Sequence, residues 1–207
     1  GAPGGGVALG LFVEGARLIF YAAYDDAAAG VTADYRLESI GTAASALKYE
    51  PGVRGRAVRC GSHTIAYPAA EIIGRARGSL SFWFKRDAQP ASGGSGLRRG
   101  AQMVNDAFAF PTERFDVGRG QWQHWVITWE TARNAAILYR NGERVEKLAL
   151  RDSFQEGTLR LAFGVPGLLD EMAVFGHVLS SGEMAGHRQR VLAGEAGWPD
   201  AAKFQPS

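Results

Sequence analysis

GQWQHWVITWETARNAAILYRNGERV occupies residues 120–145 and decides the fold of the chain. From residue 122 to 129 the side chains alternate between two faces and are rich in aromatic and β-branched types, which indicates a β-strand. One face carries Trp122, His124, Val126 and Thr128, and the other carries Gln123, Trp125, Ile127 and Trp129. Because both faces hold large apolar groups, this strand is predicted to be central and covered on both sides, with Trp122 and Trp125 buried.

A tight hairpin is predicted after this strand. Residues 131–134 are typical of a polar turn, and residues 135–140 of a second strand. Asn141-Gly142 comes next and favours a type I′ turn, because both central positions of that turn need a positive φ. Residues 143–150 are then predicted to return as a third strand.

Other strand signals are spread along the chain, with Gly-rich and Pro-rich turns between them. Strands are predicted over 17–24, 56–60, 64–67, 78–87, 103–110, 158–163 and 168–175. Ser180 and Glu183 have the spacing of a capping box, which predicts a short helix ending near Leu192. Many short strands and one helix predict an all-β fold, a two-sheet antiparallel jelly-roll sandwich with one short C-terminal helix and with Trp83 in its core.

The composition sets limits on the class of protein. The chain has 207 residues, of which 46% are hydrophobic and 21% charged, as is ordinary for a globular protein. A net charge of +2 gives no strong field for nucleic acid, and no apolar run reaches the ~18 residues of a membrane helix. The single Cys60 excludes an intrachain disulfide and Cys-rich zinc sites, and we expect a buried, inert thiol.

Three parts are expected along the chain. Residues 1–12 form a Gly-rich N-terminal arm, residues 13–193 the jelly-roll domain, and residues 194–207 an extended C-terminal tail with Trp198 and Phe204. The chain shows neither an initiator Met nor a signal-peptide pattern, which favours a mature or excised form.

Five motifs appear in the order found in a known family: an aromatic-Trp strand (78–87), a Trp-x-His strand (120–130), a Tyr-x-Asn-Gly hairpin (138–145), an Asp-Glu strand (167–175) and a Leu-Ser-x-x-Glu helix start (179–184). Over residues 17–192 the chain resembles the laminin G-like branch of the concanavalin A-like lectin/glucanase superfamily. The resemblance implies a sandwich of two antiparallel sheets, usually extracellular, that binds glycans or proteins or serves as a spacer in surface proteins.

Catalysis is not expected. Glucanases of the superfamily carry alternate carboxylates on one strand, in a Glu-x-Asp-x-x-Glu pattern that suits acid and nucleophile roles, and the chain lacks this pattern. Asp170 and Glu171 are adjacent, so on a regular strand they would point to opposite faces. His124 lies in the predicted central strand, where a hydrogen-bonded structural role is expected.

A calcium site is one possible use of two acids. The resemblance implies that Asp26 and Asp170 match acidic positions of a family that often holds calcium, and calcium takes oxygen ligands of this kind. The alternative is structural: Asp170 hydrogen-bonds nearby backbone, and Asp26 shapes a turn.

Glycan recognition requires exposed aromatic rings with polar groups close by. Tyr67 and Trp198, which lie beside Pro and loop residues, are the candidate aromatic contacts. Arg98 and Arg99 lie in a Pro-, Ser- and Gly-rich loop over 88–100 and could contact an acidic partner, although a solvated loop tip is the simpler explanation.

Two functions remain open on these grounds. The first is a non-catalytic extracellular or cell-surface module that recognises glycan or protein through rim loops, without nucleic-acid binding or membrane insertion. The alternative is a structural or decoration subunit of a surface layer, filament or virion, in which the terminal arms reach neighbouring subunits.

Overall fold

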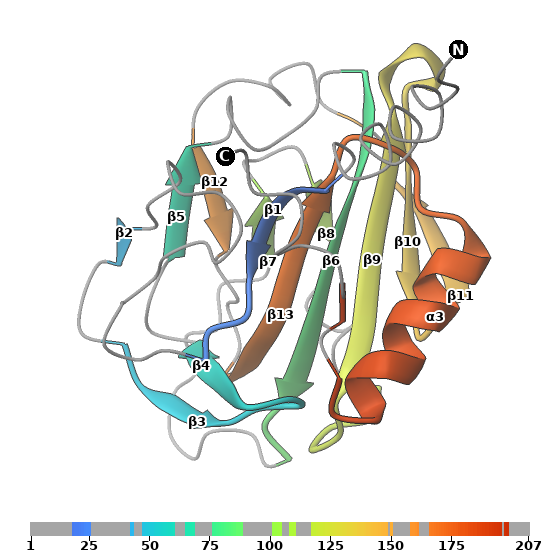
Figure 1. The fold of residues 1–207 in the computed structure, drawn as a ribbon. Helices are drawn as coiled ribbons and strands as arrows, with labels where there is room; N and C mark the ends of the chain where they lie inside the picture. The colour runs from blue at the N-terminus through green and yellow to red at the C-terminus, as the bar shows by residue number, and fades with distance from the viewer. Residues whose placement is uncertain are drawn as a thin grey trace, which may run out of the picture.

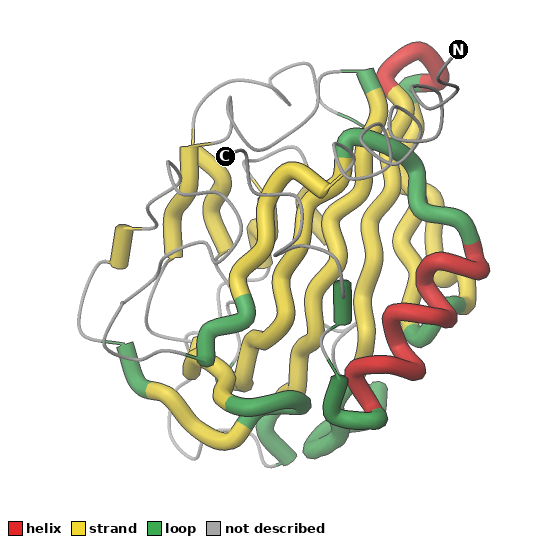
Figure 2. The backbone as a smooth tube through the Cα atoms, viewed as in Figure 1, coloured by secondary structure: helices red, strands yellow, loops and turns green. Residues whose placement is uncertain are grey.

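The computed structural model describes residues 18–25, 42–43, 47–60, 65–68, 76–88, 101–104, 108–110, 117–148, 150, 158–161, 166–195 and 197–198. Within these ranges the fold is almost entirely antiparallel β-sheet with one α-helix (Figures 1 and 2). The predicted arm over 1–12 lies outside the described residues, and so does most of the predicted tail.

The main sheet has eight strands in the order β11-β10-β9-β6-β13-β4-β3, with β1 also paired to β13. Every pairing in it is antiparallel. The strands are β1 (Leu18–Ala22), β3 (Tyr49–Pro51), β4 (Arg56–Cys60), β6 (Arg77–Arg86), β9 (Gln123–Glu130), β10 (Ala135–Arg140), β11 (Glu143–Leu148) and β13 (Gly167–Phe175).

Two smaller sheets accompany the main one. The first contains β2 (Thr42–Ala43), β5 (Ile65–Pro68) and β12 (Thr158–Leu161), and the second is a pairing of β7 (Ala101–Val104) with β8 (Phe108–Phe110). Strand β12 lies next to β7, so the two small sheets adjoin. The single strand predicted over 103–110 was wrong, because residues 101–104 and 108–110 belong to two separate strands, β7 and β8, that pair antiparallel.

Both faces of the main sheet are covered, as predicted for its central strand. On one face, alternate residues of β6 and β9 join strands β1 and β13 in the larger apolar cluster, which includes Phe82, Phe84, Trp125, Ile127 and Trp129. The other face carries a smaller apolar cluster, to which Tyr21, Val126, Phe175 and Met184 belong. Met184 comes from helix α3 (Ser181–Leu192), which is drawn in front of β9, β10 and β11 in Figure 1.

Trp122 corrects the predicted core. Trp83 and Trp125 are fully buried as expected, but Trp122 is half-buried and precedes β9 rather than lying in it. Trp122 also belongs to neither apolar cluster of the described residues, and the third fully buried indole is Trp129. The alternation of side chains was predicted correctly, but the predicted strand began at Trp122, one residue before β9 begins.

Two local predictions are confirmed in atomic detail. Asn141 and Gly142 have φ values of 53° and 89°, and they connect β10 to β11 as the hairpin prediction required. Ser180 caps α3 by accepting from the Glu183 amide at 3.2 Å, while the Glu183 carboxylate accepts from the Ser180 amide at 2.8 Å. Both signals are contained within a few residues, so the rest of the fold is not needed to interpret them.

Candidate functional site

Strand β13 changes its neighbour halfway along its length. Residues 167–169 pair with β4 and residues 172–175 pair with β1, so Asp170 and Glu171 lie between the two partners. The register against β6 shifts by one residue between Asp170 and Ala173, and Glu171 has a φ of 48°. This is a β-bulge, an extra residue that bends the strand and redirects side chains.

Asp170 holds the turn between β3 and β4. Its side chain is fully buried, and its Oδ2 accepts from the backbone amides of Val53 at 2.9 Å and Arg54 at 3.3 Å. Its Oδ1 accepts from the Glu171 amide at 2.8 Å. Gly52 allows this close approach, because a Cβ built there would lie 2.3 Å from Oδ2. Where β13 has neither β4 nor β1 as a partner, the Asp170 carboxylate therefore connects it to the β3–β4 turn.

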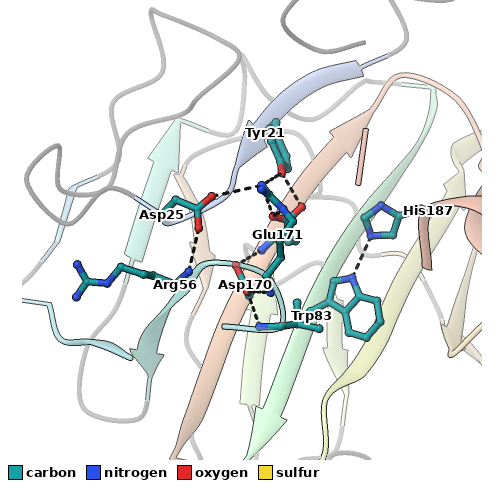
Figure 3. A network of polar contacts seen from close by, with 9 residues as sticks. Tyr21, Asp25, Arg56, Trp83, Asp170, Glu171 and His187 are labelled. Carbon is teal, nitrogen blue, oxygen red and sulfur yellow. Dashed lines mark hydrogen bonds and ion pairs between the residues drawn. The ribbon is translucent and has the colours of Figure 1, made fainter. Parts of the chain in front are cut away.

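Glu171 holds a guanidinium and a phenol. Arg54 Nε donates to its Oε1 at 2.8 Å, and the Tyr21 hydroxyl donates to its Oε2 at 2.5 Å (Figure 3). Arg54 Nη2 also donates to the Tyr21 hydroxyl at 3.2 Å and lies 3.3 Å from Asp25 Oδ2. We call Tyr21, Asp25, Arg54, Asp170 and Glu171 the carboxylate clamp, which joins β1, the β3–β4 turn and β13.

The clamp brings both acids into contact with one residue, although on a regular strand they were expected to point apart. Arg54 contacts both, Asp170 through its backbone amide and Glu171 through its side chain. The reason is the bulge, because the positive φ at Glu171 breaks the alternation that a regular strand would impose.

Burial controls the protonation of the clamp. Burial, and next the charge of Glu171, raise the pKa of Asp170 to about 9, while the amides of Arg54, Glu171 and Val53 act in the opposite direction. Burial also raises the pKa of Glu171, against the Tyr21 hydrogen bond and the Arg54 charge. The pKa of Tyr21 is raised by its burial and by Glu171. Each of these groups forms hydrogen bonds or ion pairs within the protein, which indicates a structural role.

The described residues do not fit a calcium site at Asp170. Its oxygens already accept from three amides, and the Arg54 guanidinium pairs with the adjacent Glu171. The described part of the chain holds no group of three or more His, Cys, Asp or Glu side chains placed for a metal ion. Asp26 lies outside the described residues, and its neighbour Asp25 accepts from the Arg56 amide at 2.9 Å. The contacts of Asp170 oppose calcium there, and calcium binding at Asp26 stays a prediction.

Trp198 is the one predicted glycan contact whose side chain is described. It is partly buried, with its ring stacked on His187 at 4.3 Å and 11° and edge-on to Phe175 at 4.5 Å. Tyr67 lies in β5 opposite Leu159, and only its backbone is described. Arg98 and Arg99 lie outside the described residues, so ligand binding by these four residues stays a prediction.

A second buried polar cluster lies between α3 and the main sheet. His124 Nε2 is 2.9 Å from Ser81 Oγ, which confirms the structural role expected for this histidine. Trp83 Nε1 donates to His187 Nε2 at 3.0 Å, as Figure 3 shows. His187 was not among the residues for which the sequence predicted a role. Its spacing from Met184 and Val191, the other buried residues of α3, would have placed it on the buried face of the helix.

The end of the sheet where β9 begins presents a different surface. Trp122 is half-buried there, with Lys85 Nζ 5.2 Å from its ring centroid. The preceding turn exposes Gln121, and the Val117 side chain is 51% exposed. We call Val117, Gln121, Trp122 and Lys85 the β9 rim, which combines a half-buried indole with apolar, amide and ammonium groups.

Comparisons with known proteins agree with this fold. Residues 103–185 match the laminin G-like family model described as the concanavalin A-like lectin/glucanases superfamily. No match was found among curated protein sequences. No helix in the described ranges has the length and apolar character needed to cross a membrane.

Solved structures share the fold at low sequence identity. Domain 4 of AbnA, an extracellular GH43 arabinanase from Geobacillus stearothermophilus solved with arabinotriose, is 17% identical with a TM-score of 0.60, and the match covers 82% of this chain and 97% of that one. The binding domain of Paraclostridial Mosquitocidal Protein 1 is 12% identical with a TM-score of 0.63, and the binding domain of botulinum neurotoxin serotype D is 12% identical with a TM-score of 0.56. Each of these two matches covers 83% of this chain, which spans about half (51%) of either toxin domain. Over residues 103–185 the resemblance to the concanavalin A-like lectin/glucanase superfamily is confirmed, and with it the predicted β-sandwich fold.

Proposed function

We propose that this chain is a non-catalytic recognition module that binds a glycan, and that the ligand stacks on Trp122 at the β9 rim. The observation that carries the proposal is the half-buried state of Trp122 outside both apolar clusters. An indole face that water reaches can stack on a sugar ring, and neighbouring polar groups can bind its hydroxyls. Lys85 and Gln121 supply an ammonium and an amide at this place.

The carboxylate clamp supports a non-catalytic role. A glycosidase needs one carboxyl group to deliver a proton and a second to act as nucleophile or base. Asp170 and Glu171 instead bind backbone amides, a guanidinium and a phenol in a buried place. These contacts connect strands, so the two carboxyl groups stabilise the fold and do not depend on a ligand.

The structural neighbours support a binding role without defining the ligand. The arabinanase domain was solved with arabinotriose, and the toxin domains are described as binding domains. At these identities they share only the fold with this chain. A position outside the cell or on its surface fits the same comparison and is part of the proposal.

The alternative, a structural or decoration subunit, has less support. It relies on terminal segments that reach neighbouring subunits. The part of the tail that is described packs on its own chain, through the contacts of Trp198 with His187 and Phe175.

Calorimetric titration with arabinotriose, followed by a glycan array, tests the proposal. We expect binding that weakens at least about tenfold in Trp122→Ala, which is a loss of about 1.4 kcal/mol. Leu192→Ala is the matched control, because Leu192 is an exposed apolar residue (59%) on α3 and should leave the affinity unchanged. Melting curves check that both variants are folded.

Two results would count against the proposal in different ways. If neither arabinotriose nor any glycan on the array binds, recognition of glycans is wrong. If a glycan binds equally well to wild type and Trp122→Ala, the ligand lies elsewhere, and Tyr67→Ala and Trp198→Ala then test the positions predicted from the sequence.

A further inference from the structure

Helix α3 is attached to the sheet through a histidine that must be neutral. His187 is fully buried, and its Nε2 accepts a hydrogen bond from Trp83 Nε1 at 3.0 Å. An imidazole nitrogen can accept only while it carries no proton. Protonation of His187 would therefore replace an attractive contact by two donors facing each other.

A second buried histidine lies directly opposite. His124 on β9 is also fully buried, and its ring centroid is 4.7 Å from that of His187. It contacts Ser81 Oγ through Nε2 and stacks on Trp83 at 5.1 Å. Two imidazolium ions at this separation would repel each other strongly away from water.

The described surroundings offer no charge that would stabilise imidazolium. The sheet presents Ser81 and Trp83, and the tail presents Gly197 and Trp198, all uncharged. The helix contributes the cations Arg188, near His124, and Arg190, near His187.

The Glu183 carboxylate of α3 already has hydrogen-bond partners other than the two buried histidines. Glu183 in the first turn binds Ser180 and His177. Within the described part of the chain, the charged groups that act on the two buried rings are cations, and no carboxylate is among them.

We propose that α3, with the tail as far as Trp198, is a proton-coupled latch. Uptake of two protons, one each by His124 and His187, releases the helix from the sheet while the strands stay paired. Release uncovers the outer face of the main sheet, where Val126 and Phe175 are buried beneath the helix and Trp198. This goes beyond the proposed glycan binding and does not depend on it.

The size of the effect follows from linkage. Burial, and then the charges of His187 and Arg188, hold the pKa of His124 well below its ordinary value. Burial lowers the pKa of His187 to about 3, with Arg190 contributing in the same direction and the Gly197 backbone opposing it. The native pKa values are depressed, so the contribution to stability is present above about pH 6.5 and is lost as pH falls towards the native values. At pH 5 each released histidine favours opening by about 30-fold, and the two together by about 1,000-fold.

Hydrogen exchange of the α3 amides, corrected for intrinsic rates, measures the opening constant between pH 7.5 and pH 5. We expect log K(open) to rise with a slope approaching −2 per pH unit below the histidine pKa, while amides of β6 and β9 stay protected. Val191→Ala removes buried apolar contact from the same helix face. This control should raise opening by one factor at every pH and leave the slope unchanged.

Substitution of each histidine tests which side chains take up the two protons. His187→Gln keeps an acceptor for Trp83, and His124→Gln keeps a partner for Ser81, so each single variant should lower the slope to about −1 and the double variant to about zero. A wild-type slope near zero, or helix and sheet amides that open together at every pH, would overturn the proposal. If the glutamine variants do not fold, the slopes of wild type and Val191→Ala decide it alone.

Discussion

At the scale of the residue, Arg54 forms ion pairs with two carboxylates, those of Asp25 and Glu171. Its guanidinium is the cation beside Glu171, whose side chain is 0% exposed. Arg54→Ala should therefore lower the free energy of unfolding by about 3–5 kcal/mol, the usual loss when one member of a buried pair is removed. Urea denaturation measures the difference.

Arg133→Ala is the matched control for the loss of an arginine. Arg133 pairs with Glu130 but is 78% exposed, so its removal should change stability by less than about 1 kcal/mol. Similar losses in the two variants would show that Glu171 does not depend on Arg54, and a loss in Arg54→Lys equal to that in Arg54→Ala would show that charge is not what matters.

The sequence indicated these acids but not their arrangement. Asp170 and Glu171 stood out as a pair, and the structural reading of Asp170 as a partner of nearby backbone is what its contacts show. Their common contact with Arg54 was missed, because it depends on a bulge with a positive φ at Glu171. Glycine or asparagine usually signals that conformation, so a glutamate gave no warning.

At the scale of the element, β9 shows how a strand distributes its tryptophans. Trp129 is 1% exposed and belongs to the larger apolar cluster, whereas Trp122 lies just before the strand. Trp129→Ala should cost about 3–5 kcal/mol, because truncation of a buried indole leaves a cavity. Trp122→Ala should cost clearly less. Thermal melting of the two variants compares them, and equal losses would contradict the assignment of Trp122 to the rim.

The elements that could be predicted from the sequence are those determined by a few consecutive residues. The alternation of β9, the Asn141-Gly142 turn and the Ser180–Glu183 cap are each decided within a few residues, and all three are confirmed. The pairing of β7 with β8 and the short β3 were missed. Strands of three or four residues depend on partners elsewhere in the chain, so their own sequence says little.

At the scale of the whole molecule, the question is whether a metal ion or an internal cation holds the strands together. The carboxylate clamp joins β1, the β3–β4 turn and β13, segments far apart in the sequence. Arg54 stands among these acids as a fixed positive charge. A calcium ion at Asp170 would have to displace three amide donors and approach this guanidinium, and both requirements oppose binding.

We therefore expect Asp170→Asn to leave any effect of calcium on the melting temperature unchanged. A ligand that binds only the native state stabilises it by RT ln(1 + [L]/Kd), so even weak calcium binding would raise the melting temperature in excess calcium. The difference between calcium and chelator is measured separately for wild type, Asp170→Asn and Asp26→Asn, so that any intrinsic destabilisation cancels. A calcium-dependent rise that Asp170→Asn abolishes would contradict the internal-cation account. A calcium-dependent rise in melting temperature that only Asp26→Asn abolishes would place the metal at Asp26, and the carboxylate clamp would then hold the strands together without a metal ion.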